Sequence, residues 1–155
     1  MQQAIKLSVD AVVFGYESET ISVLLIKRKY EPYKRQWAIP GGFVLNKESL
    51  EEAVERELKE ETGIKINYLE QLYTFGNPNR DPRSRVVSVA YFGLIKPSAF
   101  KTFASTDAEE VLLSLNILDE LDEKVSKGSG RPANLFKFNQ QRYFKLKKEG
   151  IIFEI

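Results

Sequence analysis

The chain has 155 residues, of which 43% are hydrophobic and 29% are charged, and its formal net charge is +1. These values are typical of a soluble globular protein with one main domain, and the longest apolar runs are too short to span a bilayer. The sequence contains no cysteine and no histidine, which excludes disulfides and thiolate metal sites and fits a reducing cytoplasm. Any bound metal must be held by oxygen, which favours Mg²⁺, Mn²⁺ or Ca²⁺.

The start of the chain predicts antiparallel β-structure. Residues 5–14 and 21–27 are rich in β-branched and aliphatic side chains, and they predict two strands joined by a hairpin connection at residues 15–20. A charged loop follows. The segment WAIPGG, which begins at Trp37, then predicts a short extended piece that ends in a tight turn.

One well-defined helix is predicted next. Ser49 and Glu52 have the spacing of a capping box, in which each residue's side chain accepts a hydrogen bond from the backbone of the other. Gly63 provides a left-handed stop. We therefore expect a helix over residues 50–62.

The second half of the chain predicts more strands and a second helix. Strands are expected over residues 65–75 and 86–95, and the segment GNPNRDPRSR between them predicts a surface loop that faces a ligand. The apolar spacing from Asp107 to Val125 predicts a helix with an acidic surface. Residues 133–138 and 151–155 predict two short strands. This combination is an α+β layer architecture.

Three glutamates continue the apolar face of the first helix. At about 100° per residue, the apolar residues of its first turns lie within about 60° of Glu57, and so do Glu60 and Glu61. A helix that is merely solvated keeps its charges opposite its apolar face, so these carboxylates require a positive group against them. Carboxylates this close either raise a pKa or recruit a cation such as Mg²⁺. The other glutamates of the helix are interpreted as solvated: Glu51, Glu52 and Glu55.

A signature runs from Gly42 through Glu48 and ends with RELKEETGI, which starts at Arg56. It resembles the signature of the Nudix hydrolases at every fixed position. So many specified positions at fixed spacing make a chance match improbable. The resemblance implies a Nudix-type mixed sheet sandwiched by helices. It also implies a loop, helix and loop that bind a divalent metal, Mg²⁺ or Mn²⁺, and cleave a nucleoside diphosphate linked to another group.

The resemblance assigns the expected metal ligands, which are the Gly41 carbonyl, Glu57, Glu60 and Glu61. Gly42 is expected to let the backbone approach the metal and the substrate phosphates without a Cβ in the way. The catalytic residues are expected to be Glu57 and Glu60, with Arg56 bracing the glutamates.

Two further motif residues are expected to be structural, and the general base stays open. Glu48 ties the loop to the helix start, and Gly63 ends the helix. Glu57 or Glu60 removes the proton from water, or a later acid does so: Glu109 or Glu110.

Residues 69–95 resemble the ADP-ribose pyrophosphatase branch of the family and the related Nudix-type transcriptional regulators. The loop arginines would then donate hydrogen bonds to phosphates, or they belong to a surface turn pinned by salt bridges: Arg80, Arg83 and Arg85. Tyr33 and Trp37 would stack on a base, or Trp37 belongs to the core. The expected substrate is ADP-ribose or a similar NAD-related diphosphate.

The C-terminal segment supports an alternative function. Residues 112–139 and the closing GIIFEI resemble the last helix, the wing hairpin and the final strand of the winged-helix domain in those regulators. Residues 124–149 carry eight bases against one acid, which suits either DNA or a solvated surface. The alternative is therefore a regulator that senses ADP-ribose or a sugar-related metabolite and binds DNA through a winged helix.

The sequence divides into a Nudix domain, residues 1–111, and a partial winged-helix-like segment, residues 112–155. The regulators are much longer, and both the entry helices of the winged helix and the closing strand and helix of the Nudix domain are missing between Val111 and Leu112. The missing helices argue against DNA binding, because a helix-turn-helix needs its first helix to set the angle of the second. The intact signature favours the hydrolase, since a pure sensor does not need all the metal-binding glutamates. The resemblance also implies a homodimer, and no membrane partner is expected.

Overall fold

The structure is a computed structural model that describes residues 4–18, 20–31, 33–99, 108–113, 118–125 and 133–148. Its elements in chain order are β1 (Lys6–Glu17), β2 (Thr20–Arg28), β3 (Trp37–Ala38), β4 (Gly41–Phe43), α1 (Leu50–Thr62), β5 (Glu70–Phe75), β6 (Val86–Ile95), the 3₁₀-helix η1 (Pro97–Ala99), β7 (Ala108–Leu113), β8 (Leu118–Val125), β9 (Ala133–Phe138) and α2 (Gln140–Lys148).

β1 is the central strand of the main sheet. It pairs in parallel with β6 along one edge. Along its other edge it pairs antiparallel with β4 near its start and with β2 near its end. β5 pairs with β6, and both β3 and β7 pair with β2. One parallel pair among antiparallel neighbours makes this a mixed sheet, which confirms the predicted α+β class.

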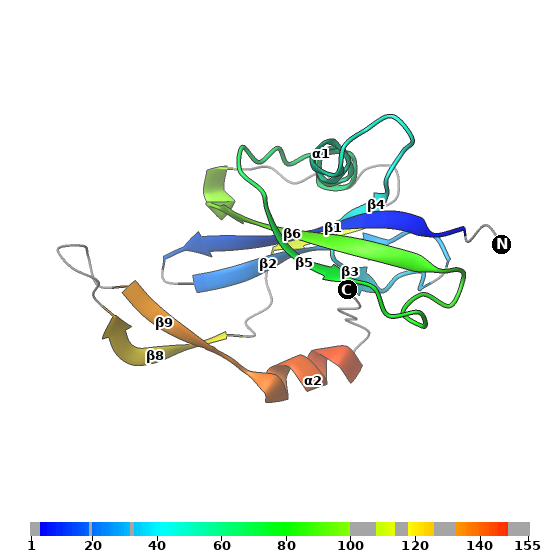
Figure 1. Ribbon diagram of the computed structural model, residues 1–155. Coiled ribbons are helices and arrows are strands. Elements are labelled where there is room, and N and C mark those ends of the chain that lie inside the picture. The colour runs from blue at the N-terminus through cyan, green and yellow to red at the C-terminus, as the bar shows by residue number, and fades with distance from the viewer. Residues whose placement is uncertain are drawn as a thin grey trace.

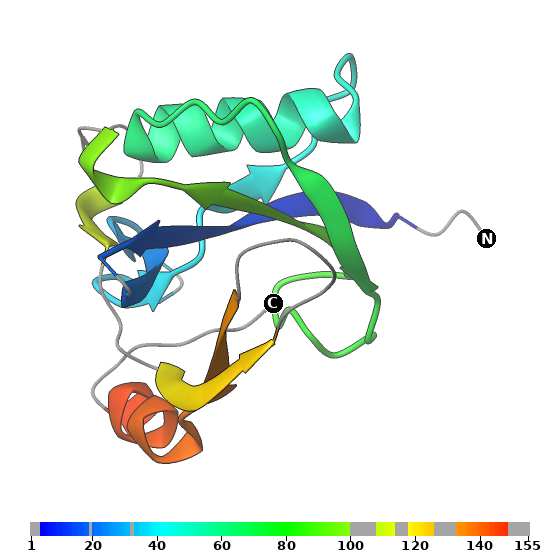
Figure 2. The same cartoon turned by 90° about the vertical axis from the view of Figure 1, so that its left-hand side faces the viewer.

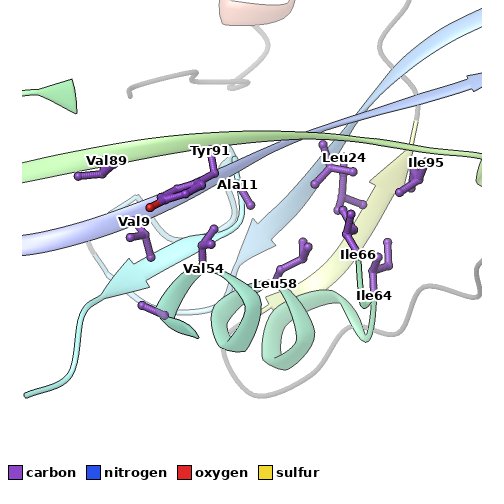
Figure 3. Close-up of a cluster of buried hydrophobic side chains, with 12 residues drawn as sticks. Val9, Ala11, Leu24, Val54, Leu58, Ile64, Ile66, Val89, Tyr91 and Ile95 are labelled. Atoms are coloured by element: carbon purple, nitrogen blue, oxygen red, sulfur yellow. The ribbon is translucent and has the colours of Figure 1, made fainter. Parts of the chain in front are cut away.

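α1 covers one face of the main sheet and encloses the core (Figure 1). In β1, Val9, Ala11 and Val13 alternate with less buried residues and point to the same face. Figure 3 shows Val54 and Leu58 of α1 beside side chains from β1 and β6. Burying a side chain of this size contributes roughly 1.5–3 kcal/mol, so the core fixes α1 on the sheet.

The bounds predicted for the first helix are confirmed. Ser49 Oγ accepts a hydrogen bond from the Glu52 amide at 3.1 Å, and the Glu52 carboxylate accepts one from the Ser49 amide at 2.8 Å. Gly63 has a φ of 72°, in the left-handed region that favours glycine. The helix therefore starts and stops where its local sequence dictates.

The strand predictions hold with one shortening. Strands cover the segments expected near residues 5–14, 21–27, 86–95 and 133–138. In the segment expected over residues 65–75, only β5 is a strand, and Ile64 and Ile66 before it are buried in the core. The strand expected over residues 151–155 lies outside the described residues.

The helix predicted from Asp107 to Val125 is wrong. Residues 108–113 and 118–125 are the strands β7 and β8. The apolar spacing fits a helix, but β7 pairs antiparallel with β2, and such long-range pairing overrides a local pattern. The predicted domain boundary between Val111 and Leu112 falls inside β7, at the point where the sequence suggests a missing segment.

The C-terminal elements also differ from the expected winged helix. β8 and β9 form a separate two-stranded antiparallel sheet, and the unpredicted helix α2 follows it. The helix expected before the wing hairpin is instead one of the hairpin's own strands. Figures 1 and 2 show β8, β9 and α2 on the side of the main sheet opposite α1. In the described part of the chain, no helix is long and apolar enough to cross a membrane.

Candidate functional site

Gly41 and Gly42 of β4 bring the backbone against the glutamates of α1. The Gly41 amide donates a hydrogen bond to Glu61 Oε2 at 2.9 Å. A Cβ at Gly42 would lie 2.3 Å from Glu57 Oε1, and one at Gly41 would lie 2.3 Å from the Val9 carbonyl oxygen. A Cβ would therefore clash with backbone at Gly41 and displace the Glu57 carboxylate at Gly42, so the two glycines let Glu57 and Glu61 lie beside one stretch of backbone.

Arg56 holds the other acids of the motif together. Its Nε and Nη2 donate to the two carboxylate oxygens of Glu48 at 2.9 and 2.6 Å. Its Nη1 donates to Glu57 at 2.7 Å and to Glu60 at 3.2 Å. Its Nη2 also reaches the carbonyl oxygen of Phe43 at 3.1 Å. One guanidinium thus joins the end of β4, the loop and one face of α1.

Glu48 links this guanidinium to the loop before the helix. Its Oε1 accepts a hydrogen bond from the Leu45 amide at 2.8 Å as well as the one from Arg56. The Arg56 hydrogen bonds, followed by the Leu45 amide, lower the pKa of Glu48 to about 2. Glu48 is therefore a carboxylate whose charge the fold stabilises strongly.

Glu57 is in the opposite electrostatic situation. Burial raises the pKa of this half-buried carboxyl, although Arg56 opposes the shift. Glu61 is only 6% exposed, whereas the side chain of Glu60 is 51% exposed. The three glutamates of the motif thus range from buried to solvated, and their spacing on the helix does not make them equivalent.

The bend at Pro40, with Gly41 and Gly42 at the start of β4, is called the glycine turn. The residues at the glycine turn fit a divalent cation by their chemistry. All the donors are oxygens, and the raised pKa of Glu57 indicates that its charge lacks full compensation. Among the residues that the structure describes, however, no group of three acidic side chains is arranged to hold a metal ion. Mg²⁺ keeps several of its waters and needs few protein ligands, so a hydrated ion is compatible with Gly41, Glu57, Glu60 and Glu61 as partners.

An open cleft of about 1010 Å³ begins at the glycine turn. Its lining includes four residues of the motif segment, Gly41, Gly42, Glu57 and Glu61. It also includes four residues predicted from the sequence to contact substrate, Tyr33, Trp37, Arg80 and Arg83. The motif residues Glu48, Arg56, Glu60 and Gly63 are not among the residues that line it. The cleft therefore combines a carboxylate end with an arginine loop, which is an arrangement suited to a metal-bound phosphate compound.

The three loop arginines have different environments. Arg83 forms a forked ion pair with Asp81 through Nε at 3.0 Å and Nη2 at 2.7 Å. The Nε of Arg80 is buried with no hydrogen-bond partner in the described part of the chain. Arg85 does not line the cleft, and its Nη1 donates to the Val86 carbonyl at 3.4 Å. The alternative prediction, a surface turn held by a salt bridge, therefore applies to Arg83. Arg80 is the arginine best placed to bind a ligand.

The aromatic residues lie in and beside a strained loop. Trp37 is half-buried with Lys27 Nζ 5.6 Å from its ring centroid, and it lines the cleft with Tyr33. Tyr33 and Arg35 have φ values of 66° and 64°, which are uncommon for residues with side chains. Such strain often marks ligand-binding segments. Both rings line the cleft, as stacking on a base would require.

Asp10 of β1 is a cleft residue that sequence reasoning missed. It lies beside Gly41, and Ser88 Oγ of β6 donates a hydrogen bond to its Oδ2. Burial raises its pKa, while the Ser88 hydrogen bond and the charge of Arg80 oppose that shift. The available signal was one aspartate inside an otherwise apolar strand, LSVDAVVF. The possible later bases, Glu109 and Glu110, belong to β7, but their side chains lie outside the described ones.

Comparisons with known proteins support one family. Residues 4–133 match the NUDIX domain model. The ADP-ribose pyrophosphatase of Methanocaldococcus jannaschii is 42% identical over 119 residues, which are 74% of this chain and 69% of that protein. The ADPR responsive transcriptional repressor NtrR of Acinetobacter baylyi is 41% identical over 97 residues, which are 61% of this chain and 39% of the repressor.

Solved structures give the same result. A MutT/nudix family protein from Enterococcus faecalis is 38% identical with a TM-score of 0.71, covering 89% of this chain and 53% of that one. The NUDIX domain of Shewanella oneidensis NrtR, complexed with ADP ribose, is 36% identical with a TM-score of 0.66, covering 72% of this chain and 73% of that one. The chain thus spans about half or less of the Enterococcus protein and the Acinetobacter repressor.

Replacing Arg56 is expected to destabilise the fold. The Arg56→Gln change removes the positive charge that Glu48 and Glu57 share, and hydrogen bonds between charged groups contribute about 1.5–3 kcal/mol. We expect the free energy of unfolding in urea to fall by about 2 kcal/mol. Arg83→Gln is the control, because the Arg83 side chain is 46% exposed and an exposed pair contributes at most about 1 kcal/mol. Equal losses in the two variants would contradict the central role of Arg56.

Glu48 is expected to make the folded state sensitive to acid. The pKa of Glu48 is about 2 in the folded state and about 4.5 in the unfolded chain. Its contribution to the free energy of unfolding is therefore complete above about pH 4.5 and is lost as pH falls towards 2. The difference in urea unfolding free energy between the wild type and Glu48→Gln should therefore shrink as pH decreases through that range. Glu55→Gln, at an exposed position of α1, should show no such convergence.

Proposed function

We propose that this chain, which belongs to the NUDIX family, is a hydrolase that uses Mg²⁺ or Mn²⁺ to cleave the diphosphate of ADP-ribose or a related nucleoside diphosphate derivative. The observation that carries the proposal is the cleft that has Glu57 and Glu61 against the glycine turn at one end and Arg80 in its wall. The likeness to the Methanocaldococcus ADP-ribose pyrophosphatase supports the substrate class.

The proposed metal partners are the Gly41 carbonyl, Glu57, Glu60 and Glu61. A bound divalent cation supplies neutralisation of phosphoryl oxygens and a lower pKa for a bound water. Gly41 and Gly42 leave space for phosphate oxygens to approach the backbone, because neither carries a side chain. Arg56 keeps Glu57 and Glu60 in place through their shared contact with its Nη1.

The reaction requires a base, and Glu57 is the preferred candidate. Its carboxylate lies against Gly42 and lines the cleft, whereas Glu60 does not line it. Glu57 takes a proton from water, the water oxygen attacks one phosphorus, and the bond from that phosphorus to the bridging oxygen breaks. With ADP-ribose the products are AMP and ribose 5-phosphate. Glu60 is the second candidate, and its side chain is more exposed.

Arg80 and Arg83 are proposed to bind the substrate phosphates, and Tyr33 and Trp37 to contact the base. Arg83 already pairs with Asp81, so it mainly shapes the cleft wall. Only the donors that this pair leaves over can bind a substrate phosphate. Arg85, proposed from sequence as a third phosphate contact, has less support because it does not line the cleft.

Metabolite sensing is the second candidate function. The likeness to the Acinetobacter repressor and to the ADP ribose complex of the Shewanella NrtR domain favours it. DNA binding through the basic C-terminal segment has weaker support, because β8 stands where the winged helix needs a helix. A homodimer stays a prediction of the family resemblance, and a cytoplasmic location stays a prediction from the absence of cysteine.

Hydrolysis is expected to depend on the motif glutamates. Purified protein with Mg²⁺ and ADP-ribose should release AMP and ribose 5-phosphate, as measured by chromatography. Glu57→Gln and Glu60→Gln should each reduce kcat by about 100-fold or more, as expected when a base or a metal ligand is lost. Glu55→Gln on the exposed side of α1 is the matched control and should retain full turnover. Normal turnover in Glu60→Gln would remove that residue from the mechanism.

Alanine at Gly41 and alanine at Gly42 are expected to have different effects on stability and activity. At Gly42, the new Cβ meets the end of the flexible Glu57 side chain, so Gly42→Ala should lower kcat about 100-fold with little loss of stability. At Gly41, it meets the backbone oxygen of Val9, so Gly41→Ala should lower the free energy of unfolding by about 1–3 kcal/mol. Thermal melting and ADP-ribose turnover of both variants check this. A Gly42→Ala protein with full activity would argue against the placement of Glu57.

A further inference from the structure

Phe43 is an exposed aromatic residue to which the proposed mechanism gives no role. It is the last residue of β4, directly after Gly41 and Gly42, and it pairs with Ser8 of β1. The residue is 38% exposed and lines the cleft. Ligand sites are lined largely by apolar and aromatic side chains, so a ring in this position is a candidate part of the binding surface.

The ring of Phe43 contacts a cation of the arginine loop, residues 76–85 between β5 and β6. The guanidinium carbon of Arg83 lies 5.8 Å from the ring centroid. This is within the distance of about 6 Å at which the face of an aromatic ring attracts a cation. Lys6 Nζ lies 5.4 Å from the same centroid, so the ring has two cationic neighbours. A side-chain contact therefore connects the arginine loop to the end of β4.

Asp81 holds the same guanidinium from within the loop. Arg83 Nε and Nη2 donate to the two carboxylate oxygens of Asp81 at 3.0 and 2.7 Å. The Arg83 side chain is 46% exposed, and an exposed ion pair holds a side chain only weakly by itself. The Phe43 ring adds a second contact to the guanidinium and so restricts its position further. Nη1 takes no part in the fork, and its protons are left for another acceptor.

Phe43 also contacts the guanidinium that organises the motif. Its carbonyl oxygen accepts a hydrogen bond from Arg56 Nη2 at 3.1 Å, and Arg56 Nη1 donates to Glu57 at 2.7 Å. One residue thus joins the acidic end of the cleft through its backbone and the arginine loop through its ring. The placement of Arg83 relative to Glu57 therefore depends on Phe43.

We propose that Phe43 is a positioning residue, whose ring holds the guanidinium of Arg83 so that Nη1 donates to an anionic oxygen of the substrate diphosphate. This inference rests on the proposed function, because it takes the diphosphate as the ligand. The ring has no charge and no hydrogen-bond donor, so its contribution to phosphate binding must come through Arg83. Loss of the ring should therefore weaken substrate binding and leave the chemical step unchanged.

The test is a double-mutant cycle in KM and kcat for ADP-ribose with Mg²⁺. Phe43→Leu keeps an apolar side chain but removes the ring, and it should raise KM about fivefold with kcat changed less than about twofold. Phe43→Tyr keeps the ring and should retain the wild-type KM. Arg83→Gln should raise KM at least as much as Phe43→Leu. In the Arg83→Gln background, Phe43→Leu should produce no further rise, because the residue that the ring positions is gone.

Tyr68→Leu is the matched control. It removes an aromatic ring that is 66% exposed and is not among the residues that line the cleft, so KM and kcat should both keep their wild-type values. Thermal melting of each variant measures any loss of stability separately. A fall in stability without a rise in KM would assign Phe43 to packing alone and would contradict the proposal.

Three kinetic results would also overturn the proposal. An unchanged KM in Phe43→Leu would show that the ring does not affect substrate binding, and an equally raised KM in Phe43→Tyr would show that the ring is not what matters. KM effects that multiply in the double variant would show that Phe43 does not act through Arg83. If Phe43→Leu does not fold, Arg83→Lys decides. It keeps the charge but lacks the planar fork, so a normal KM would refute a positioned guanidinium.

A failure of the proposed function gives a different result. If the wild type does not hydrolyse ADP-ribose, the same variants are compared by calorimetry for binding of inorganic pyrophosphate with Mg²⁺. Binding that Phe43→Leu weakens about fivefold and Phe43→Tyr preserves would support the positioning role without hydrolysis, and equal binding in all variants would refute it. A wild type that neither cleaves ADP-ribose nor binds pyrophosphate would refute both proposals together.

Discussion

The site depends on the contact between one guanidinium and several carboxylates of like charge. Without Arg56, the acids that α1 and its preceding loop bring together would repel one another at short range. With it, Glu48 is fixed at 2.6 Å and Glu57 at 2.7 Å, and the chain can place a half-buried Glu57 against the glycine turn. The same residue thus stabilises the fold and shapes the cleft, which is why its loss should affect both.

The mixed sheet explains how distant segments meet at this contact. β1 pairs with β4 at residues 8–10 and with β6 at residues 6–15, so the glycine turn and the end of the arginine loop are both anchored to one strand. α1 packs over the same strand through its apolar face (Figure 3). Three segments that are far apart in sequence therefore share one rigid support, as precise placement of a binding site requires.

Local chemistry decided which features could be predicted from the sequence. The helix of residues 50–62 was predictable because its cap, its apolar face and its glycine stop all lie within one short segment. The strand β7 was not, because its partner β2 lies about eighty residues earlier and its apolar spacing also fits a helix. Asp10 was missed for a related reason: its role in the site follows from its contacts with Ser88 and Gly41, which are far from it in sequence.

The charges that line the cleft fit the proposed combination of a metal ion and an anionic substrate. Its acids are Asp10, Glu31, Glu57, Glu61 and Asp81, and its bases are Arg28, Arg80 and Arg83. Arg83 is committed to Asp81 by its forked ion pair. Acids outnumber bases in the lining, although Arg56, outside the lining, also contacts Glu57. A diphosphate entering alone would be repelled there, whereas a diphosphate entering with a divalent cation would neutralise the carboxylates. In the proposed function, the acidic turn and the arginine loop are therefore parts of one site, in which a cation would make the acidic end compatible with an anionic substrate.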